Sequence, residues 1–373
     1  MRVSYVGPLK DYSGYGEANR HTVAALMAAG VDVVGELLKY TAESSDFGEL
    51  GKLMNQSLSN KGEYDIRIMH TTPDEYSRLM KPGKYHIGQF YWETDKVPET
   101  FAKNLNLVDE IWTGSQANVD AMKFAGVTKP IYVFPQATET KREFPEPYII
   151  NEFDGYVFYS IFEWIDRKNP EALLRAFYKE FAGQKDVALV IKTYFRNFTL
   201  NNKRMIRSAV KNIKAELGVD EFPAVFLYLD LMDRRQIMRL HSTGDCFVSA
   251  HRGEGWGVPQ VEAALAGKAI ISTGYGGVHE YLEDKKTAML PSFKMVQLTG
   301  MSHSQYWYTP DQQWAEINMD DLQAAMRWAY NNQDDAKKMG KKAQAFAKKA
   351  FSFDAVGKMM VDRLNKIKEG LDT

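Results

Sequence analysis

The sequence has one cysteine and no long apolar run. Cys246 stands alone among 373 residues, which excludes an intramolecular disulfide and a cysteine-based metal cluster. This cysteine usage fits a reducing cytoplasm best. No stretch approaches the roughly 18 consecutive apolar residues that a membrane-spanning helix needs. Residues 1–7 have the pattern of a strand rather than of a signal peptide. We therefore expect a cytoplasmic protein with no transmembrane segment.

The sequence also has no excess of charge of one sign. Its 47 Lys and Arg residues and 48 Asp and Glu residues give a formal net charge of −1. Such a chain has no global attraction to nucleic acid or to an acidic membrane surface. Six lysines between positions 337 and 349 fall at helical spacing around Met339 and Phe346. This spacing favours a solvated helix face over a nucleic-acid site.

Three common catalytic motifs are missing. The sequence contains no H-E-x-x-H zinc motif, no Walker A phosphate loop and no G-x-S-x-G nucleophile elbow. Their absence argues against a zinc metalloprotease, a P-loop nucleotide hydrolase and an α/β-hydrolase. We expect neither a metal ion nor a cofactor.

The order of the apolar patterns predicts two α/β domains. A chain of this length, with 45% hydrophobic residues, can form about two cores of ordinary size. Strand-like runs alternate with helical patterns, as in βαβ units with a parallel sheet. Residues 136–151, with two prolines, predict a linker. The expected strands are 2–6, 65–69, 85–91, 110–113, 131–134, 156–162, 187–192, 225–229, 246–250, 269–273 and 288–290, and the expected helices are 17–29, 170–181, 204–217, 258–267, 319–331 and 334–370.

The most informative stretch follows the strand expected at 246–250. It reads H-R-G-E-G-W-G-V-P and leads into a helix with Pro259 in its first turn. A glycine-rich turn before a helix N-terminus is an anion site, because free N–H groups and the positive end of the helix dipole point at the ligand. A diphosphate fits that description. Glu254 and Glu262 flank the turn and are suited to accept hydrogen bonds from sugar hydroxyls.

Glu254 and Glu262, with seven residues between them, resemble the E-x7-E motif of the retaining GT-B glycosyltransferases of family 4, the group 1 glycosyltransferases. Residues 263–271 and 273–280 also resemble that family. The resemblance implies an α/β fold of the GT-B class, with two Rossmann-like parallel-sheet domains facing a central cleft. Residues 1–150 would form the acceptor-side domain, residues 151–350 the nucleotide-sugar-binding domain, and residues 351–373 a helix that crosses back to the N-terminal domain. It further implies that Glu254 faces the donor sugar and that Glu262 binds the nucleotide ribose.

The resemblance also implies a pair of cations that holds the donor diphosphate. Lys168 matches the lysine of that pair, but the arginine expected shortly before it is missing, and Glu163 lies in its vicinity. Lys192, at a strand end, and Arg252, beside the motif, are the candidates for the missing charge. At least one cation is needed to stabilise a diphosphate leaving group when no metal ion does so.

Two stretches of the N-terminal half are further candidates. Gly14 and Gly16 lie between the first strand and the first helix, where the family has a glycine loop near the leaving phosphate; a plain tight turn is the alternative. Residues 92–98 resemble the W-E-x-D-x-x-P stretch of some family members. Trp92 is expected to stack on an acceptor sugar, and Glu93, in preference to Asp95, to orient its hydroxyl. A structural role for both acids is the alternative.

Two other features leave alternatives open. His70 is a rival to Glu93 as the acceptor-side group, although a single histidine at a strand end more often has a structural role. The aromatic residues at 306–308 and Trp314 either line a sugar subsite or pack as an insertion on the second domain, and the packed insertion is preferred.

The prediction is a metal-independent transferase that moves a sugar from a UDP- or GDP-linked donor to an acceptor hydroxyl with retention of anomeric configuration. The alternatives are an epimerase or a phosphorylase-like enzyme on the same fold, or a non-catalytic partner protein. The acceptor is left open among a glycan, a lipid-linked glycan, a protein and a modified nucleic acid, and so is the oligomeric state. The candidate catalytic residues are Glu254, Glu93 and Lys168; the donor-binding residues are Glu262, Lys192, Arg252, Gly255, Trp256, Gly257, Val258, Gly14 and Gly16; the acceptor-side residues are Trp92 and Asp95.

Overall fold

The computed structural model describes residues 1–40, 47–150, 153–299 and 306–371. They form two compact units. Unit 1 consists of Met1–Lys141, Tyr306–Gln312 and Lys348–Thr373, and unit 2 consists of Arg142–Gln305 and Gln313–Ala347. The stretch between Arg142 and the predicted boundary at residue 150 therefore belongs to unit 2. No helix in the described part of the chain is long and apolar enough to cross a membrane.

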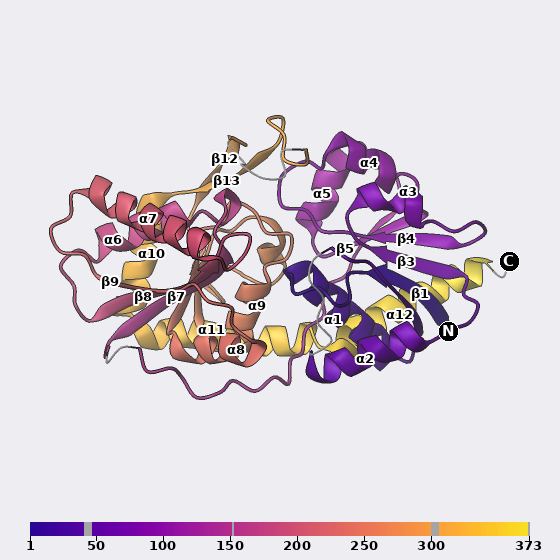
Figure 1. Cartoon of the computed structure of the whole chain (residues 1–373), viewed down its shortest axis with the longest axis horizontal. Coiled ribbons are helices and arrows are strands. Elements are labelled where there is room, and N and C mark those ends of the chain that lie inside the picture. Colours follow the sequence, from indigo (N-terminus) through magenta and orange to yellow (C-terminus); the bar gives the residue numbers. More distant parts are fainter. Residues whose placement is uncertain (41–46, 151–152, 300–305, 372–373) are drawn as a thin grey trace. The chain divides into compact units, whose positions relative to one another are not determined.

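Unit 1 is built on a parallel sheet of six strands in the order β2-β1-β3-β4-β5-β6. Helices α1, α2 and α12 contribute to the core on one face, and α3, α4 and α5 to the core on the other (Figure 1). The strands are β1 Arg2–Gly7, β2 Asp32–Leu37, β3 Ile66–His70, β4 Tyr85–Gln89, β5 Glu110–Thr113 and β6 Ile131–Val133. The helices are α1 Gly14–Ala28, α2 Gly48–Ser59, the 3-10 turn η1 Pro73–Glu75, α3 Tyr76–Leu79, α4 Glu99–Leu105, α5 Gln116–Phe124 and α12 Phe353–Leu371.

Unit 2 contains a parallel sheet of five strands in the order β11-β10-β7-β8-β9, and an antiparallel pair, β12 and β13. Helices α6, α7 and α10 pack on its large core. The strands are β7 Tyr156–Glu163, β8 Val187–Tyr194, β9 Ala224–Tyr228, β10 Cys246–Ser249, β11 Ala269–Ser272, β12 Phe293–Gln297 and β13 Gln313–Ile317. The helices are η2 Asp166–Lys168, α6 Pro170–Glu180, α7 Leu200–Leu217, α8 Arg234–Thr243, α9 Val258–Leu265, η3 Gly276–Glu280, α10 Met319–Asn331 and α11 Gln333–Ala350.

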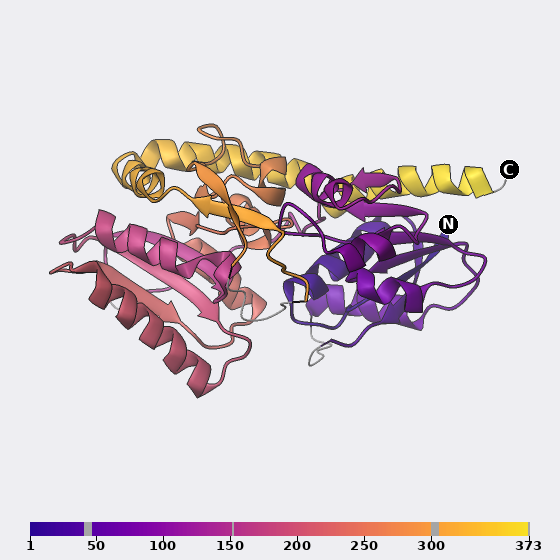
Figure 2. The same ribbon diagram turned by 90° about the horizontal axis from the view of Figure 1, so that it is seen from above.

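The last helix, α12, is part of unit 1 and packs along α1, as both views show (Figures 1 and 2). Gly357 permits this close approach, because a Cβ atom at that position would lie 2.2 Å from the carbonyl oxygen of Ala25. Arg363 on α12 is ion-paired with Glu110, which is fully buried at the start of β5. Helix α12 is thereby fixed to the rest of unit 1 by packing and by charge.

Most predicted elements are confirmed, two predictions are wrong, and several elements, β2 among them, were not predicted. Strand β2 was not predicted, because Gly35 and Glu36 interrupt its apolar pattern. In the structure α2 packs closely against the backbone of Gly35, and Glu36 forms an ion pair with the buried Arg67. Residues 288–290 form only isolated bridges and no strand. The helix predicted for 334–370 is two helices, α11 and α12.

The break between α11 and α12 has a clear local cause. Phe351 is buried, and its carbonyl oxygen accepts a hydrogen bond from the Thr138 amide at 2.7 Å. Ser352 then caps the new helix, because its hydroxyl accepts from the Ala355 amide at 3.1 Å. A side-chain cap of this kind satisfies one of the free N–H groups at a helix start.

Strand order places the ligand site of unit 2. Chain order runs from β7 to β9 on one side of the sheet and from β10 to β11 on the other, so the direction of winding reverses between β7 and β10. In open parallel sheets ligands bind outside the carboxyl ends of the strands at such a reversal. The loops that follow β7 and β10 are the two stretches that carry the predicted donor-side residues.

Candidate functional site

The loops after β7 and β10 meet at the side chain of Glu254. Lys168, in η2 after β7, forms an ion pair with Glu254 Oε1. Arg167 lies 3.4 Å from Glu254 Oε2 and donates to the Gly253 carbonyl oxygen at 2.8 Å. Glu254 is only 7% exposed, so one buried carboxylate is held by two cations. The prediction placed Glu254 and Lys168 in one site, and the structure brings them together.

The charge state of Glu254 follows from these contacts. Burial would raise the pKa of Glu254, but Lys168 and Arg167 outweigh burial and lower the pKa to about 2. The group is therefore a carboxylate at any pH near neutral, able to accept hydrogen bonds but not to donate a proton. Two cations against one carboxylate also leave one positive charge in excess, which suits an anionic ligand.

Backbone packing fixes the loop that carries Glu254. The amide of Gly277 donates to the Glu254 carbonyl oxygen at 2.7 Å. A Cβ atom on Gly277 would lie 2.3 Å from the Gly255 carbonyl oxygen, and one on Gly276 would lie 2.4 Å from that of Glu254. The two glycines of η3 therefore allow a contact between loops that no larger residue would permit.

The loop that carries Glu254 leads directly into helix α9. Gly257, the residue before the helix, has φ of 89°, which favours glycine, and it provides no side-chain cap. Tyr281 donates to the carbonyl oxygens of Trp256 and Gly257, both at 3.0 Å. Trp256 is buried at 3% exposure, so it supports the loop and offers no open ring face. Val258 begins α9, whose first-turn N–H groups have no side-chain acceptor from Gly257 and are suited to a phosphate.

Glu262 lies in the interior of α9 and is also held by cations. It accepts from Arg142 at 2.9 Å, is ion-paired with Arg234, and lies 3.3 Å from His241 Nε2. Glu262 is 3% exposed, whereas the Arg234 side chain is 40% exposed. Burial, with the nearby charges of Arg142 and Lys268, lowers the pKa of His241 to about 3, so His241 is neutral. Arg234 is the member of this cluster that a ligand can reach.

Lys192 lies at the carboxyl end of β8, on the same sheet edge. Its ammonium lies 5.2 Å from the ring centre of Phe198 and 5.7 Å from that of Tyr194. The residue is 5% exposed, and burial lowers the pKa of Lys192 to about 8. Most Lys192 side chains are therefore still charged at pH 7. A charged ammonium in such surroundings gains from an anionic ligand.

Arg252 is engaged away from Glu254. Its Nε donates to Glu316 Oε2 at 2.7 Å, and another guanidinium nitrogen donates to the Asp166 carbonyl oxygen at 2.8 Å. The guanidinium also lies 5.0 Å from the ring centre of Trp314. These contacts tie the loop after β10 to β13 and to η2. Arg167, and not Arg252, is the second cation beside Glu254.

In unit 1 the predicted acceptor-side residues lie just after β4. Glu93 accepts a hydrogen bond from the Tyr308 hydroxyl at 2.8 Å. Trp92 is 3% exposed, and Tyr308 stacks on it with 5.0 Å between ring centres and 14° between ring planes. The expectation that Trp92 offers a ring face to a sugar is therefore wrong, because Tyr308 already covers that face. Glu93 and Asp95 are partly exposed.

The aromatic residues at 306–308 and Trp314 divide between the two units. Trp307 and Tyr308 pack on the core cluster of unit 1 that contains Trp92 and Phe101, while Trp314 is buried in unit 2. A packed segment was preferred over a sugar subsite; Trp307, Tyr308 and Trp314 are packed, whereas Tyr306 is 93% exposed. The surface they pack on was predicted wrongly, since Trp307 and Tyr308 lie on the first unit rather than on the second.

The remaining candidates of unit 1 have mainly structural contacts. His70 is fully buried, its Nδ1 lies 2.6 Å from the Tyr5 hydroxyl, and burial lowers its pKa to about 3. Gly16 could not be replaced without a clash, because a Cβ atom would lie 2.3 Å from the Asp11 carbonyl oxygen, and its amide donates to Ser13 Oγ at 3.2 Å. Gly14 has open space around it.

Four residues next to the two glutamates were not predicted from the sequence. Arg167 is adjacent to Lys168 in sequence, and this basic dipeptide in the turn after a strand was a usable signal. His251 is fully buried near Glu254, and burial lowers its pKa to about 4. Arg142 and Arg234 come from a stretch without periodicity and from the start of a helix, and no local pattern links either one to Glu262.

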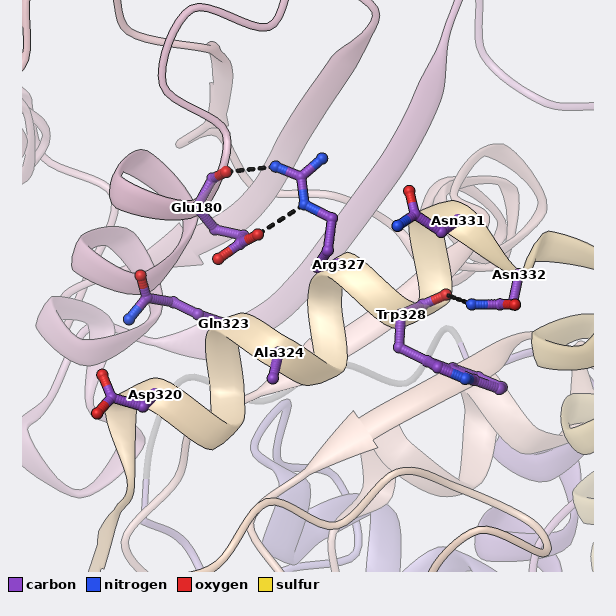
Figure 3. Close-up of a pocket in the computed structure, with 8 residues that line it drawn as sticks. All are labelled: Glu180, Asp320, Gln323, Ala324, Arg327, Trp328, Asn331 and Asn332. Carbon is purple, nitrogen blue, oxygen red and sulfur yellow. Dashed lines mark hydrogen bonds and ion pairs between the residues drawn. The ribbon is translucent and has the colours of Figure 1, made fainter.

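A depression of about 500 Å³ lies elsewhere on unit 2, along α10 (Figure 3). Arg327 points from α10 toward Glu180 and donates to its carboxylate at 2.6 Å. The other lining residues are Asp320, Gln323, Ala324, Trp328, Asn331 and Asn332. None of the predicted catalytic or donor-binding residues lines it, and the charged sheet edge described above is the better candidate site.

Residues 151–297 match the family of glycosyl transferases group 1. No curated protein sequence matches the chain. Among solved structures, Anabaena HepE in complex with UDP and glucose is 14% identical, with 98% of this chain and 100% of HepE covered and a TM-score of 0.66.

Sucrose-phosphate synthase from Thermosynechococcus elongatus is also 14% identical, with 99% and 100% of the two chains covered and a TM-score of 0.70. A trehalose-6-phosphate structure from E. coli bound with UDP-2-fluoro glucose is 12% identical, with 98% and 99% covered and a TM-score of 0.67. The fold is GT-B. Identities this low establish the fold alone. Together with the family match over 151–297, the fold supports a glycosyltransferase.

Proposed function

We propose that this protein transfers a sugar from a nucleotide-sugar donor to an acceptor hydroxyl with retention of anomeric configuration and without a metal ion. The observation that carries the proposal is the Glu254 carboxylate held by Lys168 and Arg167 at the point where strand order reverses. The family match covers this stretch, and HepE, a protein of the same fold, was solved with UDP and glucose.

Each group of the site has a role in the proposed reaction. Glu254, ionised and buried, accepts hydrogen bonds from the donor sugar. The excess positive charge of Lys168 and Arg167, with the N-terminal amides of α9, faces the diphosphate and stabilises the negative charge that develops when the glycosidic bond breaks. A nucleoside diphosphate is a stable anion, so it needs no proton from Glu254 to leave.

Glu262 binds the ribose hydroxyls in the proposed complex. Its carboxylate already has Arg142, Arg234 and His241 as partners, so a ribose would share the carboxylate with them. Arg234 is the exposed member of this cluster, so its side chain can adjust to the bound ligand. Lys192 adds a further cation to the same edge of the sheet.

Nucleotide binding tests the proposal. A ligand present at 100 times its Kd stabilises the folded state by about 2.7 kcal/mol, so UDP or GDP should raise the melting temperature by roughly 5 °C. Glu262→Gln should remove this rise, because the ribose loses a charged acceptor. The measurement is thermal unfolding of both proteins with each nucleotide, scored as the difference between melting with and without ligand.

A matched control separates binding from folding. Glu180→Gln breaks the ion pair with Arg327 in the same unit, away from the predicted donor-binding residues. It should lower the starting melting temperature but keep the full nucleotide shift. Equal shifts in Glu262→Gln and in wild-type protein would show that Glu262 does not contact the nucleotide.

A further inference from the structure

The segment between β12 and β13 carries residues that contact the acceptor-side stretch of unit 1. Residues 306–312, called the clasp below, belong to unit 1, although β12 and β13 themselves belong to unit 2. The clasp lies after the end of the family match at residue 297. It is therefore a feature of this chain that the match does not describe.

Apolar contacts attach the clasp to unit 1. Tyr308 stacks on Trp92, and Trp307 lies 5.8 Å from Phe101 between ring centres. Trp92 and Phe101 are also 5.7 Å apart in an edge-to-face arrangement. Aromatic pairs at these distances add about 0.5 to 1.5 kcal/mol each beyond the apolar area they bury. Trp307 and Tyr308 of the clasp thus pack against the core of unit 1.

Polar contacts fix the clasp in register with residues 93–96. Thr94 Oγ1 lies 2.9 Å from Gln312 Oε1, and both residues are buried, at 4% and 1% exposure. Gln312 in turn donates to the Trp307 carbonyl oxygen at 2.7 Å. Lys96 and Asp311 form an ion pair at 2.5 Å. These contacts hold the residues on both sides of Glu93 and Asp95.

The hydrogen bond from Tyr308 to Glu93 connects the clasp to the predicted acceptor-side carboxylate. It joins residues 215 positions apart in the sequence, at 2.8 Å between Tyr308 Oη and Glu93 Oε2. The stack on Trp92 fixes the Tyr308 ring, so its hydroxyl has a defined direction. Glu93 is partly exposed, so its side chain reaches the surface while Tyr308 holds it.

We propose that Tyr308 is a positioning residue that fixes the Glu93 carboxylate for an acceptor hydroxyl. This inference rests on the proposed sugar transfer. A carboxylate with one oxygen bound by a rigid donor loses few rotamers on binding substrate, and a well-oriented group reacts faster than a mobile one. Tyr308 acts through Glu93 and touches no substrate itself.

The test compares transfer with hydrolysis in three variants. Tyr308→Phe keeps the stacked ring and removes only the hydroxyl, Glu93→Gln weakens the acceptor, and Tyr308→Phe/Glu93→Gln combines them. With UDP-glucose and GDP-mannose as donors and p-nitrophenyl glycosides as acceptor probes, Tyr308→Phe should lower kcat/KM for the acceptor about 10-fold, as expected for one hydrogen bond to a charged group. Release of UDP or GDP without acceptor and the donor KM should not change.

The matched control is Tyr306→Phe, which removes the hydroxyl of the neighbouring clasp tyrosine. Tyr306 is 93% exposed, and this variant should transfer like wild type. In the Glu93→Gln background, Tyr308→Phe should have no further effect. Wild-type transfer by Tyr308→Phe would overturn the role of Tyr308. A loss of the same size when Tyr308→Phe is added to Glu93→Gln would also overturn it. If wild-type protein releases no nucleotide from either donor and transfers nothing, the failure lies in the proposed function instead.

Discussion

Glu254→Gln should lower the rate of sugar transfer by about 100-fold or more, the effect of removing one preorganised electrostatic group from an active site. Glutamine keeps the size of the side chain but removes the charge that Lys168 and Arg167 balance. The sugar then loses a charged acceptor, and two cations remain beside it without a counter-charge. Transfer is measured as release of nucleoside diphosphate at saturating donor.

The loss of Glu254 should also lower stability, and the two effects must be separated. Breaking a buried ion pair by removal of one partner costs about 3 to 5 kcal/mol. Rates should therefore be measured at a temperature where thermal unfolding shows both proteins folded. Glu283→Gln, which changes an exposed glutamate paired with Lys286, should transfer like wild type. Wild-type transfer by Glu254→Gln would mean that the site has been assigned to the wrong carboxylate.

The second large effect concerns pH. Burial lowers the pKa of His70 and of His241 to about 3 and that of His251 to about 4, from 6.5. Above pH 6.5 these imidazoles are neutral in both the folded and the unfolded chain, so they add no pH dependence. Below pH 6.5 only the unfolded chain binds the protons, and the free energy of unfolding falls as the pH falls.

This loss of free energy of unfolding is large, because a typical protein is stable by only about 5 to 15 kcal/mol. Near pH 5 the unfolded chain holds nearly three more protons than the folded chain at these sites, which gives a slope of roughly 4 kcal/mol per pH unit. His86, whose pKa burial also lowers, adds in the same direction. Burial raises the pKa of Asp245, so this one carboxyl changes the free energy of unfolding in the opposite direction. Urea unfolding at pH 7, 6 and 5 measures the slope.

A variant identifies the histidines as the cause. His251→Gln removes one of the three groups and should reduce the slope near pH 5 by about 1.4 kcal/mol per pH unit, the value for one proton. His251 faces Glu254, Lys168 and Arg167, so its removal also alters the charge of the site. For that reason the slope, and not the absolute stability, is the quantity to compare. An unchanged slope would show that acid unfolding has another origin.

The donor side of the site could be predicted because its residues lie close to regular elements. Lys168 and Glu254 each follow a strand of a parallel sheet, and strands in a Rossmann-like order bring such loops together. Arg142 was beyond prediction, because it comes from a stretch without periodicity and its contact with Glu262 spans 120 positions. Local patterns carry no information about such a pairing.

The acceptor side shows why an aromatic motif can mislead. Trp92 follows a strand and stands beside two acids, which is a pattern typical of a sugar site. In the structure its ring is covered by Tyr308 from a segment more than 200 positions away. The sequence indicates that an aromatic surface exists but not which segment packs on it.

The most direct test of the proposed function is a screen of nucleotide sugars with wild-type protein and Glu254→Gln. Each protein is incubated with UDP- and GDP-linked sugars, and the released nucleoside diphosphate and sugar are identified by mass spectrometry. The proposed function predicts release from at least one donor by the wild-type protein and about 100-fold less by the variant. Folded wild-type protein that releases no nucleotide from any of these donors, with or without added p-nitrophenyl glycosides, would contradict it.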